Sequence, residues 1–539
     1  MASLRRIVPL LLVALGLLVL VRSIASRPIG DVTTPQHVPS RFQDNAGVNR
    51  VNQWIENRWR IEQVTPVKPA EEINILRRLS LALHGTVPSL EELRQFEADR
   101  QPDRLKRWTQ RMLGDDRFPT YFAERLSRAL VGTEVGPFLA FRRDRFRAWL
   151  DKQLASDRPW DQIVTELVSA SGLPTGRPAT NFITITMVDG DVDQEKLAGR
   201  SIRAFLGQRI DCAQCHDHPF DPRWKQPHFQ GLAAFFGAAR VTALGVDDAP
   251  GRIYEVTDPG AERPREIVPA VPFGSDWLPG DGNSRQRLAA WLTHRENDRF
   301  DRAIVNRIWG LLFGQPFFSP VDDLPDPGDP DTELLSVLAR DFQDHDRDLK
   351  WLIHTIAASR PFGLGSQADD ATIDELNRLE AQWAIFPLVR LRPEQVIGSM
   401  LQAASIKTVD RNSHLLIRTV RFFRENDFVQ EYGDLGDEEL AEQTGTIPQA
   451  LLRMNGRLGR DLIESNAFSA SAHIARVTEG DDATCLASSF LVCLGRRPLE
   501  SESRFFRKWL TETRGDRRVE VVEDIFWALF NSPEFSWNH

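Results

Sequence analysis

The sequence predicts a mainly α-helical protein in which a linker rich in Gly and Pro joins two helical domains. Apolar residues recur at spacings of three and four along most of the chain, which is the period of an amphipathic helix. Helix-capping signals open several of these stretches. Between residues 239 and 284 the period gives way to Gly, Pro and Asp around short apolar runs. We therefore expect helical domains over residues 70–238 and 285–539, with short β-strands in the linker.

The composition is that of a globular protein. The chain has 539 residues, of which 41% are hydrophobic and 27% charged, and it has only 4 Cys, so collagen-like, disulfide-framework and coiled-coil classes are excluded. The 76 acidic residues outnumber the 67 basic ones, which gives a net charge of −9. Because no basic surplus is present to neutralise phosphates, we expect no nucleic acid partner.

The amino-terminal residues 1–25 resemble an export signal. Arg5 and Arg6 precede the apolar run of residues 7–21, and small residues follow up to Ala25. Because this run is shorter than the roughly 20 residues that span a bilayer, we expect a signal peptide, with a signal anchor as the alternative. A cleaved signal peptide would place the protein in the periplasm. A retained anchor would attach it to the membrane, with its domains facing the periplasm or the cell exterior.

The next segment, residues 26–69, is polar and contains several prolines, so we expect a spacer. Its only helical stripe is formed by Val51, Trp54, Ile55 and Trp59.

Helix signals of the first domain begin at residue 73. A helical period runs over residues 73–98, with a break at 85–88. Ser89 and Glu92 then have the spacing of a capping box, which predicts the start of a second helix. Further along, residues 196–210 form an amphipathic stretch, and a second one follows after residue 228.

The second domain carries the same helical signals. We expect helices over residues 285–293, 303–313, 333–342, 349–358 and 393–404, with Asp329-Pro330 as the cap before the third of them. Within these stretches, residues 302–309 should form a packed helix whose arginines are exposed. Residues 409–442 are less regular.

One pentapeptide carries chemistry: Cys212-Ala213-Gln214-Cys215-His216, which lies between the two amphipathic stretches of the first domain. Covalent attachment of haem c needs two thiols three residues apart for the two vinyl groups, and an adjacent imidazole as proximal iron ligand. Cys212, Cys215 and His216 meet these requirements. Nearby phenylalanines could wall a large flat cofactor, namely Phe205, Phe220, Phe229, Phe235 and Phe236.

The sixth iron ligand is not indicated by the spacing. No methionine follows the motif until Met400. Met187 and His228 are the candidates at hand, and an open coordination site is the third possibility.

Different chemistries could use the same residues. A zinc site could combine Cys212, Cys215 and His216 with His218 or His228, although no second ligand pair completes it. A metallohydrolase could use His216, His218 and Asp221 on one ion, which leaves the cysteines without a role. A non-redox scaffold protein could close the loop with a disulfide.

The remaining two cysteines, Cys485 and Cys493, are expected to be buried side chains. A faint internal repeat aligns Gly85, Pro88 and Glu92 with Gly495, Pro498 and Glu502, and it places Cys493 opposite a core leucine. On one helix, a separation of eight residues is a rise of about 12 Å, too far for a disulfide. We therefore expect packing rather than chemistry from this pair.

The motif region resembles the planctomycete cytochrome-c-like domain family. The resemblance is carried by Cys212-Ala-Gln-Cys-His-Asp-His-Pro-Phe-Asp221, then Trp224, Gln226 and Gly231-Leu-Ala-Ala-Phe-Phe236. The second half resembles the domain of unknown function that usually follows this family, in segments that include Leu288–Thr293, Val305–Trp309, Pro320–Asp323, Leu391–Gln395 and Asp524–Ser532. Together the two resemblances cover the chain from about Asn74 to its end.

The resemblance implies an exported protein that binds one covalent haem c through Cys212, Cys215 and His216. It assigns no reaction, substrate or catalytic residue. From the haem site itself we expect electron transfer, or a redox step that serves a partner enzyme, with an unidentified redox partner protein. Pro227-His228 stands where relatives often have a more acidic pair, which leaves the role of His228 open.

Overall fold

The computed structural model describes most of the chain: residues 42–43, 45–133, 141–217, 224–258, 260–405, 408–409, 440 and 469–539. The predicted export signal of residues 1–25 lies outside the described residues. Within them, no helix is both long enough and apolar enough to cross a membrane.

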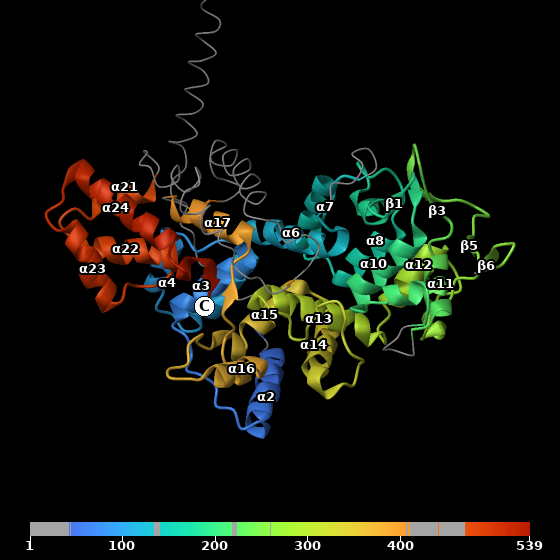
Figure 1. Cartoon of the computed structure of the whole chain (residues 1–539), viewed down its shortest axis with the longest axis horizontal. Coiled ribbons are helices and arrows are strands. Elements are labelled where there is room, and N and C mark those ends of the chain that lie inside the picture. Colours follow the sequence, from blue (N-terminus) through green and yellow to red (C-terminus); the bar gives the residue numbers. More distant parts are fainter. Residues whose placement is uncertain are drawn as a thin grey trace, which may run out of the picture.

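The protein is mainly α-helical, as the sequence predicts, and helices fill both halves of the chain (Figure 1). The first half contains α2 (Ala46–Ile61), α3 (Glu72–His84), α4 (Leu90–Ala98), α5 (Arg104–Leu113), α6 (Arg117–Val131), α7 (Arg143–Ala155), α8 (Trp160–Ser169), α9 (Asn181–Thr184), α10 (Gln194–Leu206) and α11 (Gln226–Ala234). The second half contains α12 (Ser284–Leu292), α13 (Asp298–Phe313), α14 (Glu333–Asp344), α15 (Leu349–Ala357), α16 (Ile373–Ala381), α17 (Pro393–Ala403), α21 (Ala470–Val477), α22 (Asp482–Leu494), α23 (Glu500–Leu510) and α24 (Gly515–Phe530).

The strands are short and pair only as antiparallel two-stranded ribbons in the described part of the chain. These ribbons are β1 (Met187–Val188) with β2 (Asp191–Val192), β3 (Ala239–Thr242) with β4 (Gly245–Asp248), β5 (Tyr254–Val256) with β6 (Arg265–Ile267), and β7 (Val389–Arg390) with β8 (Trp537–Asn538). The ribbons β3–β4 and β5–β6 both lie in the segment 239–284, so the expected short strands of the linker are present.

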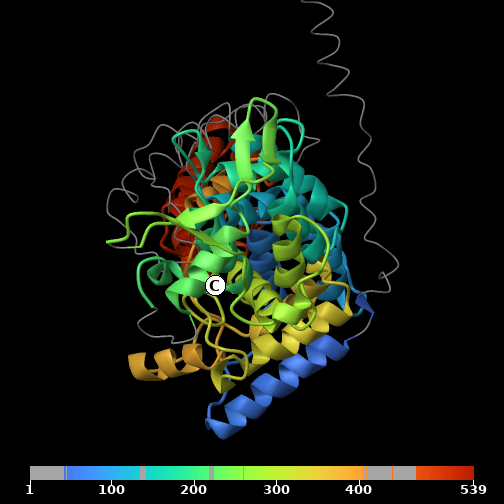
Figure 2. The same cartoon turned by 90° about the vertical axis from the view of Figure 1, so that its right-hand side faces the viewer.

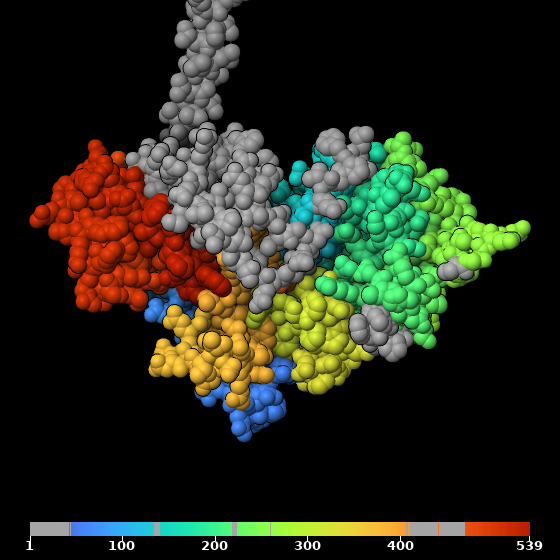
Figure 3. All heavy atoms as spheres, viewed as in Figure 1, coloured from blue at the N-terminus to red at the C-terminus, as the bar shows by residue number. Residues whose placement is uncertain are grey.

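The molecule is elongated. Helices α21–α24 occupy one end, and α10–α12 occupy the other end together with β3–β6, while α3 and α13–α15 lie between them (Figures 1 and 3). The carboxyl-terminal strand β8 lies near the centre of the molecule, where it pairs with β7. There the backbone carbonyl of His539 accepts a hydrogen bond from Arg78 Nε of α3 at 2.9 Å.

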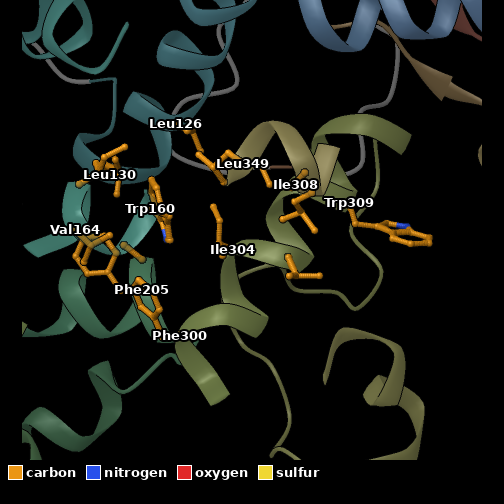
Figure 4. Packing of buried hydrophobic residues seen from close by; sticks show 14 of the residues in the cluster. Leu126, Leu130, Trp160, Val164, Phe205, Phe300, Ile304, Ile308, Trp309 and Leu349 are labelled. Carbon is orange, nitrogen blue, oxygen red and sulfur yellow. The ribbon is translucent and has the colours of Figure 1, made fainter. Parts of the chain in front are cut away.

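The main hydrophobic core takes residues from both halves. Helix α13 of the second half lies against α10 and α3 of the first half and against α14 and α15 of its own half. Figure 4 shows side chains of α13 on the side of α6, α8 and α10: Phe300, Ile304 and Ile308 of α13 lie toward Leu126, Leu130, Trp160, Val164 and Phe205. Trp309 points the other way and packs against Phe313, Phe317 and Trp383. A second core lies among α17 and α21–α24, and Leu81 and Val87 of the first half complete it.

The segment that we expected to be a spacer contributes a packed helix. In α2, Val51, Ile55 and Trp59 are at most 4% exposed, and the helix packs against α14 and α15 (Figure 2). The apolar stripe seen in the sequence is therefore the buried face of this helix.

The arginines of α13 correct one expectation. Arg302 and Arg307 are 0% and 3% exposed, so the prediction that they face solvent is wrong. Arg302 donates hydrogen bonds to the carbonyl of Pro325 and the hydroxyl of Thr332, and Arg307 donates to the carbonyl of Ala204. These partners lie outside α13, and they offset the cost of burying the two charges.

The internal repeat corresponds to two similar pairs of helices. Gly85 caps the carboxyl end of α3 with φ +71°, and Gly495 caps that of α22 with φ +72°. The predicted capping box before α4 is present, since Ser89 Oγ accepts from the Glu92 N–H and the Glu92 carboxylate accepts from the Ser89 N–H. Cys493 and Cys485 are both 0% exposed on α22, as expected.

Candidate functional site

The Cys-His motif forms a single tight turn between α10 and α11. Residues Asp211–Gln214 form a short 3₁₀ helix, η3, and the N–H groups of Cys215 and His216 both donate to the Cys212 carbonyl at 3.4 Å. Cys212 lies within η3 and Cys215 directly follows it, so the two cysteines belong to the same turn.

The turn presents its donor groups to solvent. Cys212, Cys215 and His216 are exposed, whereas Ala213 between them is fully buried and anchors the turn to the core. Both thiols are free, and their exposure contrasts with the burial of Cys485 and Cys493. A large group could therefore reach both sulfur atoms from the solvent side.

The imidazole of His216 has a defined orientation. Its Nδ1 lies 2.7 Å from the carbonyl oxygen of Asp217. Because a carbonyl oxygen only accepts hydrogen bonds, Nδ1 carries the proton and donates it. The lone pair of Nε2 is then available to a metal ion, which is the usual consequence of such a second contact.

Side chains on one face of α10 contact the Cys-His turn. Glu195, Gly199 and Arg203 are spaced four apart and so lie along one stripe of the helix. The Glu195 carboxylate accepts from Gln214 Nε2, and Arg203 forms an ion pair with Asp211. A Cβ on Gly199 would lie 2.9 Å from Oδ1 of Asp211, so this position must be small for the turn to approach the helix.

The first residue of α11, Gln226, also contacts the Cys-His turn. Gln226 Nε2 donates to the carbonyls of Gln214 at 3.2 Å and Cys215 at 3.1 Å. The backbone N–H of Gln226 donates to Asp217 Oδ1 at 3.0 Å. The motif is therefore tied to both helices that flank it.

A loop of the second half contacts the residues just before the turn. Helix α10 ends at Gly207, whose carbonyl accepts from the Leu324 N–H at 2.7 Å. Arg209 forms an ion pair with Asp322 at 2.7 Å, which raises the pKa of the Arg209 guanidinium. Both halves of the chain thus position the Cys-His turn.

A buried hydrogen-bond chain extends this contact. Trp224 Nε1 donates to Gln208 Oε1 at 3.2 Å, and Gln208 Nε2 donates to the carbonyl of Leu324. Trp224 stands two residues before Gln226, so the same chain also fixes the start of α11.

The phenylalanines expected near the cofactor pack elsewhere. Phe205, Phe229, Phe235 and Phe236 are at most 2% exposed and belong to the main hydrophobic core. Phe205 lies on α10 and Phe229 on α11, so these side chains support the helices that flank the turn. Phe220 lies outside the described residues.

The two candidates for a sixth ligand lie on different elements. His228 is in the first turn of α11, where its Nδ1 accepts from the Lys225 N–H at 3.3 Å. Met187 is in β1. Within the described ranges, no three His, Cys, Asp or Glu side chains converge on a common metal position. The zinc set that includes His228 is therefore not assembled.

The zinc set with His218 and the metallohydrolase set share residues from the segment after the turn. His218 would complete the first of these sets, and His218 together with Asp221 would complete the second. Both residues lie outside the described part of the chain.

Sequence reasoning missed the residues that hold the turn from α10. Glu195, Gly199 and Arg203 have a readable signal, a spacing of four in a stretch predicted to be helical, but nothing in that spacing says which loop they contact. For Gln226 the only sequence signal is its place in the family resemblance.

Comparison with known protein families agrees with this organisation. Residues 50–241 match the family model PSCyt2, described as a protein of unknown function (DUF1549), and residues 284–510 match PSD1, described as a protein of unknown function (DUF1553). The chain carries both domains. The Cys-His turn lies in the PSCyt2 domain, and the loop that contacts it from Asp322 and Leu324 lies in the PSD1 domain. No curated protein and no solved structure matches the chain.

Proposed function

We propose that this protein is an exported c-type haem protein that transfers electrons at the cell envelope. Cys212 and Cys215 would attach one haem covalently, and His216 would bind its iron. The observation that carries this proposal is the presence of two exposed, free cysteines in a single turn, directly followed by an exposed histidine. When bound, the haem supplies an iron that changes its oxidation state by one electron.

The residues of the turn fit such a group chemically. Both sulfur atoms are free and accessible, as thioether formation requires. The hydrogen bond from His216 Nδ1 to the Asp217 carbonyl orients the imidazole and leaves Nε2 as the nitrogen that would bind the iron. The contacts of Glu195 and Gln226 hold the turn in this conformation before any cofactor is attached.

The exposure of the turn also suggests how electrons would leave. Since Cys212, Cys215 and His216 are all at the surface, a bound group would have an edge in contact with solvent. A partner protein could then approach it directly. We propose a redox partner protein, in the periplasm or at the membrane that faces it.

The experiment is export of the chain in a host that matures cytochromes c, followed by a denaturing gel stained for haem peroxidase activity and by a pyridine haemochrome spectrum. We expect the denatured chain to keep the haem and to show one haem per chain. Cys212→Ala and Cys215→Ala should each reduce the covalent haem strongly, and the double variant should abolish it.

Cys485→Ala and Cys493→Ala are the matched controls, because these thiols are buried on α22, away from the motif. Both control variants should keep the full haem content. A wild-type chain without haem after export would refute the proposal. Zinc in the purified chain would then indicate a structural metal site, and a Cys212–Cys215 disulfide would indicate a scaffold protein.

A further inference from the structure

The hairpin β5–β6 of the linker lies against α11. Nη2 of Arg265 in β6 donates to Oε1 of Gln230 in α11 at 2.9 Å, and the Ala270 N–H donates to the Gly231 carbonyl at 3.2 Å. A Cβ on Gly231 would lie 2.8 Å from the Ala270 carbonyl oxygen, so this close approach favours glycine. The hairpin is therefore fixed to one of the two helices that flank the Cys-His turn.

Tyr254 of β5 connects this hairpin to the other flanking helix, α10. Its hydroxyl donates to Glu195 Oε1 at 2.5 Å, and its side chain belongs to the main hydrophobic core with 8% of its surface exposed. Burial and the hydrogen bond to Glu195 raise the pKa of the Tyr254 hydroxyl well above its ordinary value, so the hydroxyl keeps its proton and donates. The hairpin thus joins α10 and α11.

Glu195 extends this connection to the motif. Its second carboxylate oxygen, Oε2, accepts from Nε2 of Gln214, which directly precedes Cys215. In the described part of the chain no basic side chain forms an ion pair with Glu195, so two neutral donors hold the carboxylate. Each donor takes one oxygen, and the hydrogen bond from Tyr254 therefore fixes the rotation of the carboxylate that Gln214 contacts.

The other end of η3 is held by a more exposed contact. Arg203 pairs with Asp211, the first residue of η3, but the two side chains are 45% and 50% exposed. Ion pairs at such exposure contribute little, because solvent and salt screen them. A hydrogen bond from a buried hydroxyl to a carboxylate is stronger. The connection through Tyr254 is therefore the firmer of the two.

We propose that Tyr254 is a positioning residue for the Cys-His turn, which it holds through Glu195 and Gln214. The inference rests on the proposed function: for a haem held at this turn, motion of the turn would change the surroundings of the iron and hence its midpoint potential. A residue of the linker would then set a property of the site in the preceding domain.

The first test needs no haem. The full chain with Cys212→Ser is produced without haem and labelled in its folded state with a nitroxide, which reaches Cys215 while Cys485 and Cys493 are buried. Electron paramagnetic resonance then reports the motion of the turn. Tyr254→Phe removes only the hydroxyl, and we expect it to shorten the rotational correlation time of the label about twofold, because one of the two hydrogen bonds to the carboxylate is lost.

Two comparisons separate positioning from a general loosening of the protein. Tyr121→Phe is the matched control, because it removes the same group from a tyrosine of α6 that packs on Gly85, away from the turn. Glu195→Ala should free the label at least as much as Tyr254→Phe, and combining the two should have no further effect, because Tyr254 acts through Glu195. Unchanged motion of the label in Tyr254→Phe, or additive effects of the two substitutions, would overturn the proposal.

The second test uses the haem-loaded full chain. Tyr254→Phe should keep the wild-type haem content, because the motif is intact, and should shift the midpoint potential, whereas Tyr121→Phe should leave the potential unchanged. A potential of Tyr254→Phe equal to that of the wild type would also count against the proposal. A wild-type chain without haem refutes the proposed function, and the motion of the label then still decides whether Tyr254 positions the turn.

Discussion

Two buried histidines have pKa values far below the usual value for this side chain. Burial and, to a smaller extent, the nearby Arg117 lower the pKa of His84 to about 4, against opposing contributions from Asp115 and Glu92. Burial likewise lowers the pKa of His354 to about 4. His84 bonds the Met112 carbonyl through Nε2 at 3.1 Å, and the His354 ring packs on Phe42 with centroids 4.8 Å apart. Both are neutral in the folded protein at pH 7.

We therefore predict that stability falls between pH 6.5 and pH 4. The unfolded chain takes up a proton on each histidine near pH 6.5, whereas the folded chain resists protonation until about pH 4. Full stability is present above pH 6.5, and at pH 5 each histidine should have removed about 1–2 kcal/mol. Urea denaturation at pH 7.5 and pH 5.0, followed by tryptophan fluorescence, measures this loss.

His354→Gln should reduce the difference in the free energy of unfolding between pH 7.5 and pH 5.0 by the contribution of one histidine. His473→Gln is the matched control, because His473 is exposed on α21 and solvent reaches it in both states. If the two variants show the same pH dependence, the burial of His354 does not set it.

The sequence predicts single residues well only where their partners are close along the chain. Ser89 and Glu92 are predicted to cap α4 because the capping box is a contact between residues three apart. Arg302 is expected at the surface because its acceptors, Pro325 and Thr332, lie more than 20 residues away. Nothing within α13 itself indicates that these acceptors fold back to it.

At the scale of elements, the end of α22 offers a direct test of how the halves pack. Gly495 has φ +72°, and a Cβ there would lie 2.9 Å from Cδ of the buried Arg77 on α3. Gly495→Ala should lower the free energy of unfolding by about 1–3 kcal/mol, through backbone strain and the clash together.

Gly480→Ala separates these two causes. Gly480 has φ +90° but no atom within 4 Å of the added Cβ. This substitution should cost about 1 kcal/mol from the backbone alone. Chemical denaturation of both variants gives the difference between their free energies of unfolding. Equal losses of stability would show that Arg77 moves away from the added Cβ without an energetic cost.

Elements are predicted where the local pattern is strong. The break between α3 and α4 is expected from Gly85 and the capping box, and the Cys-His turn is expected between two amphipathic helices. For α2, the stripe of Val51, Ile55 and Trp59 indicates the buried face of the helix. Its partners α14 and α15 lie nearly 300 residues away, so the packing of the segment could not be read from the stripe.

For the whole molecule, the sequence predicts two helical halves but not the core that they share. Helix α13 packs on α10, and the loop with Asp322 and Leu324 holds the residues before the Cys-His turn. The sequence does not predict these contacts, because an apolar face of a helix can pack against any other apolar face. The periodicity does not identify the partner helix. The support of the candidate site by the PSD1 domain is for this reason visible only in the structure.

Arg285 provides the clearest test of the connection between the halves. This residue of α12 is fully buried, and its guanidinium donates to both carboxylate oxygens of Asp248 in β4 at 2.8 Å. It also donates to the carbonyls of Val168 and Ala170, which lie at the end of α8 in the first half. One side chain thus joins the second half, the linker and the first half.

We predict that Asp248→Ala lowers the free energy of unfolding by about 3–5 kcal/mol, because it leaves the Arg285 charge buried without its anion. Asp247→Ala is the control on the adjacent residue of the same strand. Asp247 pairs with Arg240 at 2.6 Å, but both side chains are more than 40% exposed, so its removal should have no measurable effect. Urea denaturation of the two variants measures the contrast. Equal stabilities would mean that the Arg285–Asp248 pair does not contribute to holding the halves together.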